Sequence, residues 1–143
     1  MQNLIVAAAI ITNEKDEILI CRRSETSKNA NLWEFPGGKL EKNETLEECA
    51  LRECKEELDI DIKLHGIFDT ANFTYPDSHI DFTFFNAKIL RGQVIRRVHR
   101  DIKWVKRENL KNNLVIRHLE EVAGVFRRRC VCLSPTTRRK KEA

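Results

Sequence analysis

Residues 37–60 read GGKLEKNETLEECALRECKEELDI, a glycine pair followed by a long stretch without glycine or proline. Good helix formers throughout its second half predict a helix over residues 45–58. Asn43 and Thr45 are candidate caps at its start. Asp59 stands at its exit, where a left-handed C-cap residue is expected, and Asp tolerates that conformation better than most residues.

Three carboxylates, Glu53, Glu56 and Glu57, fall on one side of this helix because their spacing is i, i+3 and i+4. Without a positive partner they raise one another's pKa and weaken the helix. Mg²⁺ or Mn²⁺ would relieve the repulsion, because both bind oxygen ligands. The alternative is a solvated acidic face. Gly37 and Gly38 favour the metal, since a backbone without side chains can approach an ion or a phosphate closely.

The rest of the chain predicts strands around this helix. Apolar or alternating runs at residues 4–11, 18–21, 32–35, 60–68, 72–75, 80–90 and 102–105 indicate strands, and residues 114–126 indicate a second helix. The glycine pair after Pro36 is expected to stop the strand before it. The predicted fold class is therefore α+β, a mixed sheet sandwiched between helices. We expect one domain over residues 1–128 and a basic tail over residues 129–143.

Composition narrows the setting of this domain. No window of about eighteen apolar residues is present, so no membrane partner is expected. Five cysteines without a Cys-x-x-Cys pair indicate buried thiols in a reducing cytoplasm. The four histidines fall at no zinc-ligand spacing. Residues 127–143 hold seven basic side chains and one acid, which indicates either contact with nucleic acid or a solvated end.

The spacing Gly-x5-Glu-x7-Arg-Glu-x-x-Glu-Glu, from Gly38 to Glu57, resembles the signature of the Nudix hydrolases. Cys54 and Asp59 depart from it, at positions usually aliphatic and Gly. Residues 32–39, the arginines after Cys21 and residues 75–80 are similar to the MutT branch, and the likeness covers residues 3–110. The fold class is then Nudix-type.

That resemblance implies a Mg²⁺- or Mn²⁺-dependent enzyme that converts nucleoside triphosphates to monophosphate and pyrophosphate. Glu53 would act on the attacking water or bind metal, with Arg52 and Glu44 in support; Arg52 could bridge to Glu44 or Glu48. The implied metal ligands are the Gly37 carbonyl, Glu53, Glu56 and Glu57. The implied substrate-binding residues are Arg23, Glu34, Phe35, Gly38, Lys39 and Asn112. Arg23 would contact phosphate, although a surface arginine is the alternative, and Asn112 would read a purine edge unless it caps a helix.

One departure concerns the metal set. In the MutT branch an acid stands six residues before the tryptophan of the last sheet strand, whereas this chain has Val98 there. Asp101 is a possible substitute. The expected substrate is an 8-oxo-dGTP-like purine nucleotide in a nucleotide-pool sanitising role. The alternatives are CTP or a modified dCTP, a Nudix-fold module that binds nucleotides without hydrolysis, and a nucleic-acid-associated protein using its tail.

Overall fold

The computed structural model describes residues 2–25, 33–74 and 76–110, and its strands form two sheets. The elements are β1 (Gln2–Ile11), β2 (Glu17–Arg22), β3 (Trp33–Glu34), β4 (Gly37–Lys39), α1 (Leu46–Leu58), β5 (Asp61–Thr74), β6 (Ser78–Arg91), β7 (Asp101–Lys106) and a 3₁₀ turn at Arg107–Asn109. One sheet has the order β4-β1-β6-β5 and the other β3-β2-β7. Only the β1–β6 pair is parallel among these strands, so the larger sheet is mixed.

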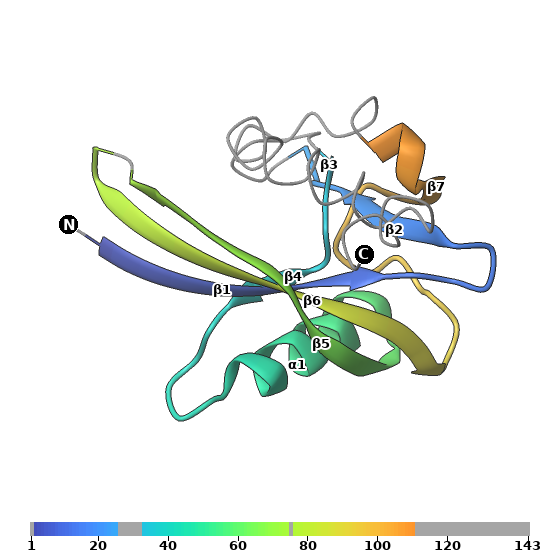
Figure 1. Cartoon of the computed structure of the whole chain (residues 1–143), viewed down its shortest axis with the longest axis horizontal. Coiled ribbons are helices and arrows are strands. Elements are labelled where there is room, and N and C mark those ends of the chain that lie inside the picture. Colours follow the sequence, from blue (N-terminus) through green and yellow to red (C-terminus); the bar gives the residue numbers. More distant parts are fainter. Residues whose placement is uncertain (1, 26–32, 75, 111–143) are drawn as a thin grey trace, which may run out of the picture.

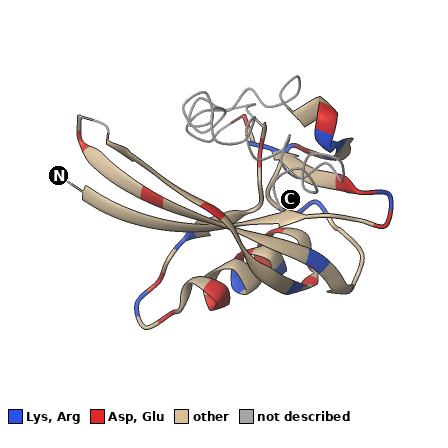
Figure 2. Cartoon of the chain, viewed as in Figure 1, with Lys and Arg blue, Asp and Glu red and all other residues tan. Residues whose placement is uncertain are grey.

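Strand β1 lies in the middle of the molecule, with α1 on one side and the smaller sheet on the other (Figure 1). It carries no charged residue, as its uniform tan colour shows (Figure 2). Ala8 and Ile10 pack with Ile18 of β2, whereas Ala9 and Ile11 belong to the cluster that includes residues of α1. Both faces of the second half of β1, residues 7–11, are therefore buried, which explains the uninterrupted apolar residues there.

Helix α1 ends at the predicted residue, Leu58, and begins at Leu46, one residue after the predicted start. Thr45 is the N-cap: its hydroxyl accepts from the Glu48 amide, and the Glu48 carboxylate accepts from the Thr45 amide. This reciprocal pair is a capping box. Asp59 adopts φ 58°, ψ 39° and donates its amide to the Lys55 carbonyl, which confirms the left-handed C-cap.

One strand prediction was wrong in detail, and one strand was not predicted. The separate strands expected over residues 60–68 and 72–75 are one strand, β5, whose register shifts between Leu64 and Ile67 and again before Asp69. These shifts break the two-residue alternation, so one long strand read as two. The strand before the glycine pair ends at Glu34, as predicted, but residues 37–39 then form the unpredicted strand β4 beside β1, where the two glycines let the strands meet.

The mixed α+β fold class is confirmed. The predicted second helix over residues 114–126, the boundary at residue 128, the basic tail and Asn112 lie outside the described residues. Within the described residues, none of the helices has the length and apolar character needed to cross a membrane.

Candidate active site

The glutamates of α1 lie directly against the two glycines of β4. A Cβ atom added to Gly38 would stand 2.6 Å from both carboxylate oxygens of Glu53, so this carboxylate covers the glycine backbone. The Gly37 amide donates to Oε1 of Glu57 at 3.2 Å. The side chains expected to carry the chemistry therefore meet the glycine turn expected to support them.

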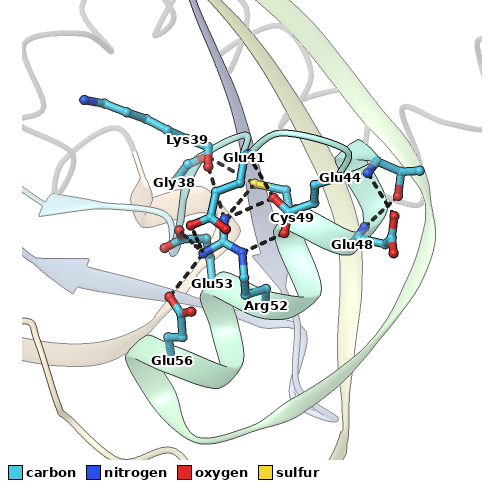
Figure 3. Close-up of polar contacts among 10 residues, drawn as sticks. Gly38, Lys39, Glu41, Glu44, Glu48, Cys49, Arg52, Glu53 and Glu56 are labelled. Carbon is cyan, nitrogen blue, oxygen red and sulfur yellow. Dashed lines mark hydrogen bonds and ion pairs between the residues drawn. The ribbon is translucent and has the colours of Figure 1, made fainter.

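Arg52 lies at the centre of the acidic residues (Figure 3). Its guanidinium binds Glu44 through Nε and Nη2, at 2.6 and 3.1 Å. Nη1 reaches Glu53 at 2.8 Å and Glu56 at 3.1 Å, and Nη2 also donates to the Lys39 carbonyl at 3.2 Å. Arg52 therefore ties the β4–α1 loop to the helix. Of the two predicted bridges it makes the one to Glu44, because the Glu48 carboxylate is used in the capping box.

Glu44 is stabilised as an anion by this contact. The hydrogen bond from Arg52 lowers the pKa of Glu44 to about 2 from its ordinary value of 4.5. A lowered pKa contributes stability above the ordinary value, and the contribution is lost as the pH falls from about 4.5 to about 2. The pair therefore persists through the range in which most carboxylates become protonated.

Glu57 is in the opposite situation. It is only 8% exposed. Burial, and next the charges of Glu53 and Glu34, raise the pKa of Glu57 to about 9. An ionised Glu57 therefore needs positive charge beside it at neutral pH. A cation bound beside Glu57 would favour its ionised form.

The donor set fits a hard divalent cation in its chemistry. Glu53, Glu56 and Glu57 offer carboxylate oxygens, which Mg²⁺ and Mn²⁺ prefer. Their carboxylates do not point toward a common cation position, because Glu53 and Glu56 face Arg52. Among the described residues, no three His, Cys, Asp or Glu side chains converge on one cation position. The Glu56 side chain is 59% exposed and can rotate away from Arg52.

The predicted substrate residues within the described part of the chain lie in or beside β3 and β4. Arg23 Nη1 pairs with Oε2 of Glu34 at 2.9 Å. Phe35 is buried, with its ring edge-on to Phe84 at 6.2 Å between centroids, so it belongs to the core. The Lys39 side chain extends away from the carboxylates, whereas its carbonyl faces Arg52 (Figure 3). The substrate-binding roles of these residues stay predictions.

His99 lies among the site residues although no sequence pattern predicted it. Its side chain is 4% exposed, and Nε2 lies 3.2 Å from Glu34 and 3.5 Å from Glu57. Val98, at the position expected to be acidic, is 58% exposed. Asp101 is exposed in β7 opposite Arg22 and accepts from the Ile102 amide, and its role as a substitute for that acid stays a prediction. Only the position beside Val98 could have signalled His99, because the histidines show no ligand spacing.

Replacing Arg52 with lysine tests the central contact. Lysine keeps the charge but cannot bind Glu44 through two nitrogens at once. We expect kcat to fall about 10–100-fold, the usual cost of removing a partner that orients reactive groups. Steady-state kinetics measure this. Lys55→Met is the control, because Lys55 faces Asp59 and Asp61 instead. An unchanged kcat in Arg52→Lys would contradict the orienting role.

An α+β fold with an acidic helix packed on a glycine-containing strand is the arrangement expected of a Nudix-type hydrolase. A sequence profile of the NUDIX domain matches residues 2–125, and the chain belongs to the Nudix family, as a MutT-like hydrolase. Nudix hydrolases generally use a divalent metal ion.

Individual relatives agree with this assignment. An 8-oxo-dGTP diphosphatase of Proteus vulgaris is 42% identical over 84 residues, which is 59% of this chain and 75% of the relative. A CTP pyrophosphohydrolase of Escherichia coli is 45% identical over 62 residues, 43% of this chain and 44% of the relative. The crystal structure of a MutT protein from Methanosarcina mazei matches with a TM-score of 0.76 and 30% identity, covering 89% of this chain and 94% of that one.

Proposed function

We propose that this protein hydrolyses nucleoside triphosphates to a monophosphate and pyrophosphate with Mg²⁺, and that 8-oxo-dGTP or a similar purine nucleotide is its substrate. The observation that carries the proposal is Glu57, a buried carboxylate with a raised pKa beside Glu53 and the glycine backbone of β4. The similarity to 8-oxo-dGTP diphosphatases supports the choice of substrate. Mn²⁺ is the chemically equivalent alternative.

The site residues have separate roles in the proposed hydrolysis. When bound, a divalent ion would supply charge that neutralises the phosphate oxygens and would lower the pKa of a coordinated water. Glu56 and Glu57, with the Gly37 carbonyl, would hold this ion, and Glu56 would turn away from Arg52 to do so. Glu53 orients a water and takes its proton. The water oxygen bonds to the α- or β-phosphorus, and the bond from that phosphorus to the oxygen bridging these two phosphates breaks. The bonding electrons stay on the bridging oxygen, which leaves with the other phosphate group, so the products are a monophosphate and pyrophosphate.

The neighbouring residues serve the substrate. Arg23, directly after β2, binds a phosphate group of the substrate. To do so it gives up some of its contact with Glu34. Gly38 and Lys39 line the path by which the nucleotide reaches the carboxylates, and Asn112 hydrogen-bonds the base. Buried free thiols at Cys21, Cys49 and Cys54 support a cytoplasmic setting.

A nucleotide panel tests this proposal. The protein is incubated with Mg²⁺ and 8-oxo-dGTP, dGTP, CTP or 5-methyl-dCTP, and the products are separated by ion-exchange chromatography. We expect equal amounts of monophosphate and pyrophosphate, and the highest kcat/KM for 8-oxo-dGTP. A preference for a cytosine nucleotide would support the alternative suggested by the CTP-hydrolysing relative. Binding without turnover of any nucleotide would identify a binding module.

Val98→Glu tests whether the acid missing at this position matters. The segment that carries Val98 is fixed to the end of α1, since the Arg97 amide donates to the Glu57 carbonyl. A carboxylate added beside it should lower the Mg²⁺ concentration for half-maximal rate by up to about tenfold. A Mg²⁺ titration at saturating nucleotide measures this, with Val98→Gln as the uncharged control. Identical titrations for both variants would place residue 98 away from the ion.

A further inference from the structure

His99 is held in place from both sides. Before it, the Ile95 amide donates to the Leu58 carbonyl at 2.8 Å, and the Arg97 amide to the Glu57 carbonyl at 3.4 Å. After it, the Arg100 amide donates to the Arg22 carbonyl at 2.8 Å. The segment between β6 and β7 is thereby attached to the end of α1 and to β2, with His99 between the two attachments.

The imidazole uses one nitrogen only. Nε2 lies 3.2 Å from Oε1 of Glu34 and 3.5 Å from Oε2 of Glu57, whereas the buried Nδ1 has no hydrogen-bond partner among the described residues. An ionised carboxylate can only accept, so the ring hydrogen is on Nε2 when these carboxylates are ionised. A histidine that acted as a metal ligand through Nε2 would have to lose this hydrogen.

Glu57 has a nitrogen beside each of its oxygens. The Gly37 amide donates to Oε1 at 3.2 Å, and His99 Nε2, whose hydrogen bond is to Glu34, lies 3.5 Å from Oε2. His99 therefore stands between the two carboxylates and limits where Oε2 of Glu57 can turn, while lone pairs of Glu57 stay open to a cation. Residues that contact metal ligands in this way orient them and tune their affinity.

We propose that His99 is a positioning residue, which orients Glu57 for the divalent ion and links it to Glu34. The inference rests on the proposed function for the identity of the ion and its ligand. It goes further in assigning a role to His99, whose neighbour Val98 stands where an acid was expected. The β6–β7 segment then acts on the metal site through an imidazole N–H instead of a carboxylate.

The test compares His99→Gln with His99→Leu. Both remove the aromatic ring, so they share the packing loss, but only glutamine retains an N–H donor. Mn²⁺ binding to the nucleotide-free protein is measured by electron paramagnetic resonance. We expect His99→Leu to weaken binding about 10–100-fold, the range for lost partners of metal ligands. His99→Gln should restore most of this affinity. Thermal unfolding should show similar losses of stability in both variants.

A matched control is His79→Leu, since His79 contacts Thr74 and Asp81 near the tip of the β5–β6 hairpin. It should leave Mn²⁺ binding unchanged. Equal Mn²⁺ affinity in His99→Gln and His99→Leu, whether both are weak or both normal, would overturn the positioning role. Strong coupling of Mn²⁺ to a directly bonded histidine nitrogen would also overturn it, because His99 would then be a ligand. Mn²⁺ binding does not depend on turnover, so a negative nucleotide panel would leave this test informative.

Discussion

Glu53→Gln should lower kcat by about 10²–10⁴, the usual range for the loss of a general base. Glutamine has nearly the same shape as glutamate, and its carbonyl oxygen can still accept from Arg52 Nη1, which lies 2.8 Å from Glu53. It cannot take a proton from water. The side chain of Glu53 is only 17% exposed, so bulk solvent is a poor replacement for it. The measurement is steady-state turnover of the best nucleotide from the panel.

The control for this variant is Glu47→Gln, the same chemical change in the first turn of α1. Glu47 is exposed and belongs to no contact of the Arg52 network described above. Its kcat should stay near that of the unmodified protein. A fall of less than tenfold in Glu53→Gln would remove Glu53 from the central role and pass the proton transfer to another group.

The second large effect concerns the two glycines of β4. Changing Gly37 to alanine should mainly lower stability, whereas changing Gly38 to alanine should mainly lower activity. At Gly37, with φ +157°, a Cβ would overlap the Ala7 carbonyl oxygen and lie 2.6 Å from Ala8 Cα. These are backbone atoms of the central strand and cannot move cheaply. Overpacking costs about 1–3 kcal/mol and the strained backbone about 1–3 kcal/mol more. That sum is a large share of the free energy of unfolding of a typical domain, about 5–15 kcal/mol.

At Gly38 the three atoms nearest the added Cβ all belong to the Glu53 carboxylate, the far end of a flexible side chain. Gly38→Ala should therefore keep most of its stability and lose activity toward the level of Glu53→Gln. Thermal unfolding and kcat are measured for both alanine variants. A folded, active Gly37→Ala, or a Gly38→Ala protein that unfolds as readily as Gly37→Ala, would contradict the packing described for β4.

Local features were predictable because neighbouring residues determine them. The limits of α1 follow from the Thr45–Glu48 capping box and from the left-handed residue Asp59. The shared side of the three glutamates follows from helical spacing. The length of β5 was not predictable, because its irregular register is set by pairing with β6, which follows it in the chain. Strand β4 likewise depends on its distant partner β1, and short glycine-rich segments have little strand preference of their own.

The sequence by itself determined the acidic helix, its glycine lead-in and the family these define, because all of them lie within one short stretch of chain. Only the tertiary structure decided what surrounds the carboxylates. Arg52 binds Glu44 and not Glu48, because the Glu48 carboxylate accepts from the Thr45 amide in the capping box. Glu57 becomes buried and difficult to ionise because β4 and His99 cover it. Burial and charge depend on segments up to 65 positions apart, such as Glu34 and His99, which only folding brings together.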